Sequence, residues 1–149
     1  MKRSTRFEPL ANIAATQARD AARRLAARMQ DVRSKEAEVE RLRGYLAEYT
    51  ELSHGSSRSV PSDRWHNEQR FLARLGEAVA IQETDLADAV QQLREEIERW
   101  RQSHRHSQGL EQLVASYTRN EALERERGEQ EEVDELAAAR GRRYPNPLA

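Results

Sequence analysis

The residues best suited to acid–base or metal chemistry in this sequence are its four histidines and its many carboxylates. His104 and His106 are two positions apart, so they point apart on a helix, whereas a metal pair on one helix face needs a spacing of three or four. The carboxylates lie in polar, helix-prone stretches, where nothing raises a pKa or excludes water. The sequence has no cysteine, no phosphate-binding glycine loop, no G-x-S-x-G and no H-E-x-x-H motif. We therefore predict no catalytic residue, no metal site and no cofactor.

Aromatic residues form the second set with a chemical use, because exposed Tyr, Trp and Phe side chains anchor protein–protein interfaces. Tyr45 and Tyr49 are one helical turn apart, and Trp65 and Phe71 follow a stretch rich in serine, with glycine and proline. If a turn brings the two segments together, these four rings gather at one end of a hairpin. They either close that end against fraying or present a contact surface, and the spacing alone favours both interpretations equally.

The composition argues against a compact core and for extended helices. Charged residues make up 34% and hydrophobic residues 37% of the chain, against roughly 25% and 45–50% in ordinary domains. The net charge of −1 gives no general attraction to nucleic acid or membrane. Charge is nevertheless uneven: residues 1–35 hold nine basic and three acidic residues (net +6), and residues 121–135 hold eight acidic and two basic (net −6). No stretch resembles a signal peptide or a membrane span, so we expect a cytoplasmic or peripheral protein.

A seven-residue repeat of apolar residues predicts a first helix over about residues 8–53. The stretch from Leu10 to Ser53 contains no proline. Ten of its twelve core positions are apolar or aromatic, and the exceptions are Arg28 and Lys35. The predicted core positions are Ala11, Ala14, Ala18, Ala21, Leu25, Arg28, Val32, Lys35, Val39, Leu42, Leu46 and Tyr49.

A loop over residues 54–61 and a second helix over about 63–140 follow. Pro61 disfavours helix at the residue before it, and Ser62 and Asp63 are predicted to cap the second helix. Gly141 and two later prolines predict a tail over 141–149. The predicted core positions of the second helix are Leu72, Leu75, Val79, Gln82, Leu86, Ala89, Leu93, Glu96 and Trp100.

A short loop between two long amphipathic helices predicts an all-α fold, a long antiparallel two-helix coiled-coil hairpin whose second helix is the longer, in a single domain over 1–149. With the turn centred near Arg58, residue i faces residue 115 − i. Residues 110–140 then form an unpartnered helical extension that frays in isolation. We expect no concave pocket, and we expect Trp65 to pack onto Tyr49 and Leu52 at the hairpin end. Charged residues at core positions, such as Glu96, either set the register or prevent self-association.

Three segments resemble the FliJ family of flagellar type III export proteins. They are "RLRGYLAEY" (residues 41–49), "SDRWHNEQRFLARLGEAVAIQ" (62–82) and "EVDELAAAR" (132–140). The most specific feature is the Arg64-Trp65 pair followed six residues later by Phe71. The length, the two-helix layout and the loop position match over nearly the whole chain.

This resemblance implies a non-enzymatic stalk that inserts in the ring of the hexameric flagellar export ATPase. It also implies contacts with the cytoplasmic linker of the transmembrane export-gate protein and with export chaperones. The protein would then be cytoplasmic and peripheral at the inner face of the cell membrane, held there only through partners. Carried over to this sequence, the gate-binding surface comprises Leu42, Tyr45, Tyr49, Phe71, Leu75 and Ala78.

Two alternatives remain open at this point. The equivalent stalk of a non-flagellar type III secretion system shares the architecture, and motility of a deletion strain separates the two. A nucleic-acid-binding coiled coil would use the basic residues 1–35, and its binding would fall steeply with salt. The net charge of −1 counts against that second alternative, so we expect no nucleic-acid partner.

Overall fold

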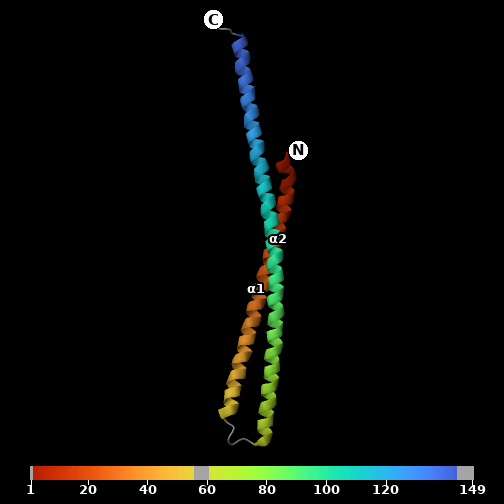
Figure 1. Cartoon of the computed structure of the whole chain (residues 1–149), viewed down its shortest axis with the longest axis vertical. Helices are drawn as coiled ribbons and strands as arrows, with labels where there is room; N and C mark the ends of the chain where they lie inside the picture. Colours follow the sequence, from red (N-terminus) through yellow and green to blue (C-terminus); the bar gives the residue numbers. More distant parts are fainter. Residues whose placement is uncertain (1, 56–60, 144–149) are drawn as a thin grey trace. The chain divides into compact units, whose positions relative to one another are not determined.

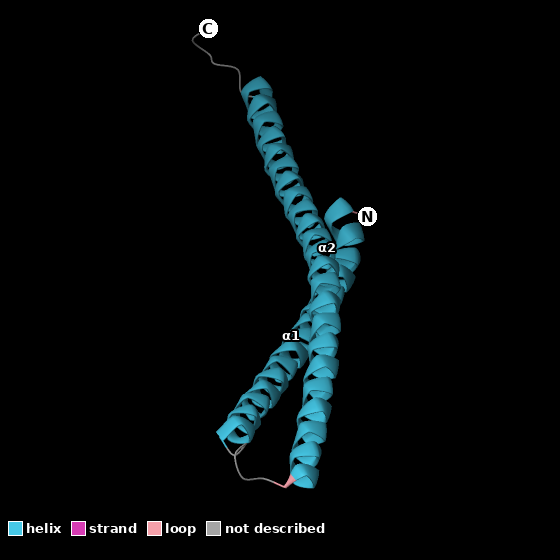
Figure 2. Ribbon diagram, turned by 60° about the horizontal axis from the view of Figure 1, so that its bottom comes forward, coloured by secondary structure: helices cyan, strands magenta, loops and turns pink. Residues whose placement is uncertain are grey.

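The computed structural model describes residues 2–55 and 61–143, and these form two helices (Figures 1 and 2). Helix α1 spans Arg3–Gly55 with 53 residues, and helix α2 spans Ser62–Arg143 with 82 residues. Apart from Lys2 and Pro61, every described position is helical. The all-α fold with a longer second helix is therefore confirmed. Neither helix, over its described length, has a segment apolar enough to cross a membrane.

The chain divides into two compact units, each made of a piece of both helices. We call residues 19–102 the hairpin unit, and residues 1–18 with 103–149 the terminal unit. Within each unit the α1 segment lies alongside the α2 segment and runs in the opposite direction (Figure 1). The single domain predicted for residues 1–149 stays a prediction.

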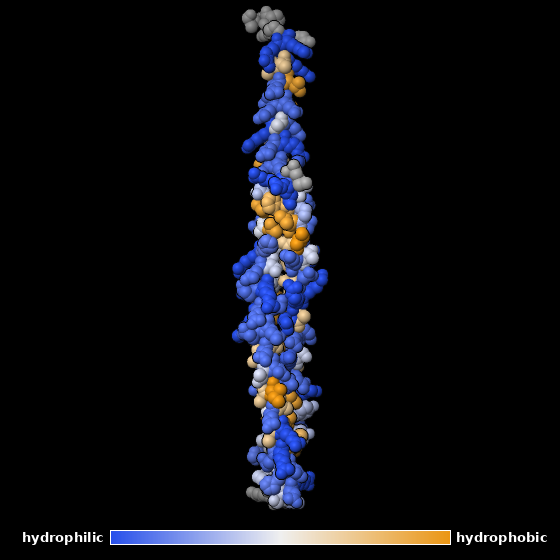
Figure 3. All heavy atoms as spheres, turned by 90° about the vertical axis from the view of Figure 1, so that its right-hand side faces the viewer, coloured by the Kyte–Doolittle hydropathy of each residue, from blue (hydrophilic) through white to orange (hydrophobic). Residues whose placement is uncertain are grey.

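The buried apolar residues lie at the predicted heptad core positions. They are small because two helices shield only a narrow seam between them, and larger residues at the same positions, such as Leu42 and Leu72, are half-buried. Hydrophilic residues cover most of the face shown in Figure 3, and hydrophobic residues gather there in separate patches. The buried apolar residues are Ala14, Ala21, Val32, Val39, Val79 and Ala89.

The predicted register is wrong by about five residues in the hairpin unit. Arg24 contacts Glu96, with 3.2 Å from Nε to Oε1, whereas the prediction placed residue 91 opposite Arg24. Arg28 contacts Gln92, with 2.8 Å from Nη1 to Oε1, where the prediction placed residue 87. The prediction assumed that the turn lies at the centre of the loop. The observed register is instead given by the side chains that meet between the two helices.

Both helices extend beyond their predicted ends. α1 begins at Arg3 rather than near residue 8 and continues through Pro9, although a proline inside a helix costs about 3 kcal/mol. α2 ends at Arg143 rather than near residue 140. The loop was predicted over 54–61; residues 54 and 55 are helical, and positions 56–60 lie outside the described residues.

The cap predicted for the second helix is shifted by one residue. The Trp65 N–H donates to the Pro61 carbonyl at 3.1 Å, so Pro61 accepts the first hydrogen bond of α2 and occupies the cap position. Ser62 and Asp63 lie inside the first turn. There the Asp63 carboxylate is near the positive end of the helix dipole, which favours a negative charge.

Candidate partner-binding site

Six residues predicted to bind a partner lie on two facing helix segments of the hairpin unit. Leu42, Tyr45 and Tyr49 follow one another on α1 at spacings of three and four, which places them on one helix face. Their counterparts Phe71, Leu75 and Ala78 have spacings of four and three on α2. The two leucines and the alanine are half-buried, while Tyr45, Tyr49 and Phe71 are 45%, 44% and 48% exposed. Leu42, Leu75 and Ala78 therefore lie at the border of the contact between the helices, and the three aromatic rings project from that contact.

The aromatic rings of Tyr49 and Phe71 meet between the two helices. Their centroids are 5.2 Å apart and their planes are inclined by 81° in an edge-to-face arrangement. Such pairs contribute about 0.5–1.5 kcal/mol beyond the area they bury. Because both rings are almost half exposed, this pair joins the helices and still offers apolar surface to another molecule.

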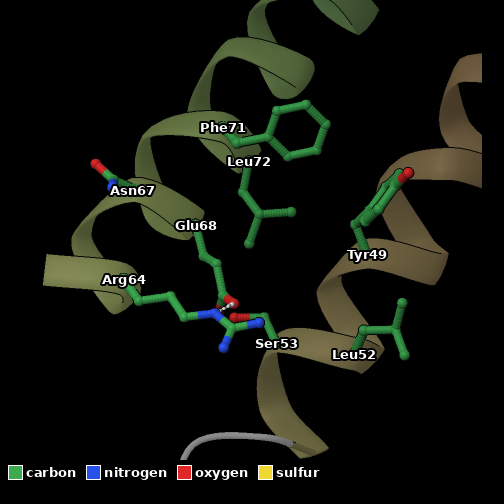
Figure 4. A pocket seen from close by; sticks show the side chains of 8 residues that line it. All are labelled: Tyr49, Leu52, Ser53, Arg64, Asn67, Glu68, Phe71 and Leu72. Carbon is green, nitrogen blue, oxygen red and sulfur yellow. Dashed lines mark ion pairs between the residues drawn. The ribbon is translucent and has the colours of Figure 1, made fainter. Parts of the chain in front are cut away.

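A hollow of about 410 Å³ opens beside this aromatic pair (Figure 4). Phe71 and Leu72 contribute from α2, and Tyr49 contributes from α1. The expectation that two helices leave no concave surface is therefore wrong, because the side chains of Tyr49, Phe71 and Leu72 border the space between the helices without filling it. The lining residues are Tyr49, Leu52, Ser53, Arg64, Asn67, Glu68, Phe71 and Leu72.

Polar groups occupy one side of the hollow. The Arg64 Nε lies 3.9 Å from the Glu68 Oε1 on the same helix, and the Gln69 amide donates across the seam to the Ser53 hydroxyl at 3.5 Å. Exposed ion pairs of this kind contribute little to stability.

The structure gives Tyr49 a different ring partner from the one predicted. Trp65 is 44% exposed, and its ring lies beside that of His66 with 5.2 Å between centroids. The register that pairs Tyr49 with Phe71 places Trp65 level with the end of α1, beyond Tyr49. Leu52 lines the hollow but is 61% exposed and points away from α2 (Figure 4).

The terminal unit contains a second ring pair, which the sequence reasoning missed. The centroids of Phe7 and Tyr117 are 5.5 Å apart, and the Arg3 guanidinium lies 5.7 Å from the centre of the Tyr117 ring. Both rings are half-buried. The heptad positions extended backward to Phe7 and forward to Tyr117 would have revealed the pair, because each occupies a core position in the continued repeat.

Glu121 caps the start of α1 beside the Phe7–Tyr117 ring pair. Its carboxylate accepts a hydrogen bond from the Ser4 hydroxyl at 2.5 Å and one from the Ser4 N–H at 3.1 Å. The hydroxyl bond, and after it the N–H bond, lowers the pKa of the Glu121 carboxyl. A side chain of α2 thus caps α1, which satisfies a donor left free at the helix start.

Within residues 2–55 and 61–143, no three His, Cys, Asp or Glu side chains are grouped so that they could hold a metal ion. The four histidines all lie in the described helices. His66 meets the Trp65 ring.

Comparisons with known proteins agree with the resemblance seen in the sequence. A family described as "Flagellar FliJ protein" matches residues 1–145. The Flagellar FliJ protein of Salmonella typhi is 26% identical over 140 residues, which cover 93% of this chain and 95% of that protein. The Flagellar FliJ protein of Escherichia coli (strain K12) is 26% identical over 137 residues, covering 91% and 93%. No solved structure matches the chain significantly. Because the family match extends over nearly the whole sequence, this protein belongs to the FliJ family.

Proposed function

We propose that this chain is a non-enzymatic component of the flagellar type III export apparatus. Its family membership supports this role, and both relatives described above carry the name of a flagellar protein. That name favours the flagellar system over a non-flagellar secretion system. The surface chemistry also supports a contact protein, because the rings at the hairpin end are about half exposed beside an open apolar hollow.

The first contact is with the linker of the transmembrane export-gate protein, through the six-residue surface on α1 and α2. The observation that carries this assignment is the Tyr49–Phe71 pair, whose rings meet at 5.2 Å and remain 44% and 48% exposed. Aromatic side chains with little conformational entropy to lose are the usual anchors of protein interfaces. The half-buried neighbours, such as Leu42 and Leu75, would exclude water around those anchors.

The second contact is with the ring of the hexameric export ATPase, through the terminal unit. In α2 every side chain from residue 129 to residue 143 is exposed. A helix with so little packing of its own depends on intrinsic propensity for its order, and a surrounding partner would supply the missing contacts. The acidic residues of 121–135 would then steer the docking.

Two further parts of the proposal follow from these contacts. The protein would act in the cytoplasm, peripheral to the inner face of the cell membrane through its partners. Export chaperones would bind to exposed edges of the paired helices. The exposed side chains Met29 and Ile81 provide apolar surface there, with 40% and 61% exposure.

The test is a binding measurement with the purified full chain, the gate-protein linker and the export ATPase. The double variant Tyr45→Ala with Phe71→Ala should weaken linker binding about 30-fold, the effect of losing a strong interface anchor. Binding to the ATPase and helicity by circular dichroism should stay close to wild type. The matched control is Ile81→Ala, which truncates another exposed apolar residue of the same unit.

Three results would contradict the proposal. If the wild-type chain bound neither the gate-protein linker nor the export ATPase, the proposed role would be ruled out. Equal loss of linker binding in Ile81→Ala would show that the effect is not specific to the surface. A collapse of helicity in the double variant would show that the rings act as a structural plug rather than a contact surface.

A further inference from the structure

A buried carboxylate interrupts the apolar seam of the hairpin unit. Glu96 occupies a core position of α2 and is only 2% exposed. Its Oε1 accepts a hydrogen bond from the Arg24 Nε at 3.2 Å, and its Oε2 accepts one from the Arg99 Nη1 at 3.2 Å. A hydrophobic residue of similar volume packs at such a site as well as a buried ion pair does, or better. Stability alone therefore does not account for a glutamate here.

A second polar contact lies one helical turn away. Arg28, at a core position of α1, donates to the Gln92 side-chain oxygen at 2.8 Å. Residues 24 and 28 are four apart on α1, and residues 92 and 96 are four apart on α2, so the two contacts are consecutive rungs across an antiparallel pair. We call the contacts Arg24–Glu96 and Arg28–Gln92 the polar ladder.

The apolar seam does not by itself select one register. Because its core positions recur every seven residues, a slide of α1 along α2 by seven residues stacks apolar residues on apolar residues again. The polar ladder does not survive that slide. One direction places Glu96 opposite Asp31, a like-charge pair, and the other places Arg24 opposite Ala89 and leaves Glu96 without a cation across the seam.

We propose that the polar ladder is a register lock, which prevents α1 from sliding along α2 within the hairpin unit. A single buried polar position is known to fix register in coiled coils at a cost in stability, and here two rungs act together. The lock does not depend on which partner binds. It has a mechanical consequence, since a displacement applied to one helix is carried by the other only if the pair cannot slide.

Engineered cysteines can measure the register directly, because the chain contains none of its own. The register of the Arg24–Glu96, Arg28–Gln92 and Tyr49–Phe71 contacts places residue 43 opposite residues 76 and 77, so Arg43→Cys with Gly76→Cys reports the native register. Arg43→Cys with Gln69→Cys reports the slide of seven residues that places Arg24 opposite Ala89, because this slide moves residue 69 to the place of residue 76. Space is open around Gly76, where an added Cβ meets nothing within 4 Å. A slide of seven residues moves the helix by about 10 Å, so a thiol crosslinker shorter than that distance separates the two states.

We expect Glu96→Leu to raise the initial crosslinking rate of the 43–69 pair about tenfold, the factor for losing a hydrogen-bonded charge. The matched control is Glu98→Leu, because Glu98 is 56% exposed and lies 3.9 Å from Arg101 on the same helix. That control should leave the 43–69 rate at the wild-type level.

The opposite slide gives a second readout. Arg43→Cys with Glu83→Cys reports it, and this pair should keep its wild-type rate even in Glu96→Leu. The reason is that Arg28 would then face Arg99, a like-charge contact that the substitution leaves in place. An equal rise of both slid pairs would point to general loosening and would overturn the proposal.

Two other results would also overturn it. One is an unchanged 43–69 rate in Glu96→Leu while the native 43–76 pair still crosslinks. The other is an equal rise in Glu98→Leu. If circular dichroism shows that Glu96→Leu does not fold, Glu96→Gln decides: it keeps the shape and one acceptor but loses the charge, so a smaller rise supports the lock and no rise refutes it.

Discussion

Two aromatic pairs join α1 to α2 in the described part of the chain, and they differ in their surroundings. Tyr49 and Phe71, in the hairpin unit, meet at 5.2 Å and border an open apolar hollow. Phe7 and Tyr117, in the terminal unit, meet at 5.5 Å, are half-buried and lie next to the Ser4–Glu121 hydrogen bonds. The first pair is therefore suited to binding, and the second to holding the start of α1.

This difference shows how one contact type can serve two purposes. The pairs differ in geometry, edge-to-face at 81° for Tyr49–Phe71 and tilted at 32° for Phe7–Tyr117, but the use of each pair depends on what lies around it. Where the rings stay exposed, truncation should cost affinity. Where they support a helix that contains Pro9, truncation should cost local order.

The largest expected effect on local stability comes from Phe7→Ala. We expect this substitution to destabilise residues 3–18 by about 2 kcal/mol, less than for a fully buried phenylalanine because the ring is half-buried. Hydrogen exchange at the backbone amides of 3–18 should then accelerate. Unchanged exchange there would mean that the ring pair does not hold this segment.

A smaller effect in the opposite direction is expected from Gly128→Ala. An added Cβ meets nothing within 4 Å, so the substitution should stabilise the helix around residue 128 by about 1 kcal/mol. Slower amide exchange over residues 123–143 is the measurement. The matched control is Gly76→Ala, equally open but in the hairpin unit, which should leave exchange over 123–143 unchanged.

Removal of the cap on α1 should have a more local effect. In Glu121→Gln the Ser4 hydrogen bonds lose their charged acceptor, so exchange at the first amides of α1 should increase while the Phe7–Tyr117 contact persists. Glu124→Gln is the control, since it removes a charge one turn further along α2. An equal change in both variants would attribute the effect to net charge rather than to the cap.

The smallest effect is a pH dependence of the same contact. The pKa of Glu121 is lowered by the Ser4 hydrogen bonds, so its contribution to stability is present above the unfolded-state pKa and is lost as pH falls through the folded-state pKa. The Ser4 amide resonance in NMR should titrate with a midpoint below the usual glutamate value of about 4.3. The transition should be absent in Glu121→Gln.

The heptad spacing was sufficient to predict the fold and most of the core, although Tyr49, also placed at a core position, is 44% exposed. Val32, Val39, Val79 and Ala89 are buried at predicted core positions, because a seven-residue repeat fixes which face of each helix meets the other. The same spacing placed Tyr45, Tyr49 and Phe71 on facing segments, although nothing in the structure tests their binding role. Glu96 was also noted at a core position, where it would either set the register or prevent self-association, and its burial beside Arg24 is the basis of the first interpretation.

The register and the helix ends were not predictable from spacing. A repeat of seven residues is satisfied by several registers, so the contact between Arg24 and Glu96 appears only in the structure. The start of α1 was placed too late, because the contacts of Ser4 and Phe7 with α2, which accompany the helical course from Arg3 through Pro9, appear only in the structure. Trp65 was assigned to Tyr49 through the same register error.

The most direct test of the division between binding and anchoring is a crossed comparison of Phe71→Ala and Phe7→Ala. Each variant is measured for affinity to the gate-protein linker and for amide exchange over residues 3–18. We predict that Phe71→Ala loses at least about tenfold in affinity with wild-type exchange, and that Phe7→Ala shows faster exchange with wild-type affinity. The reverse pattern, or loss of affinity in both variants alike, would contradict the account.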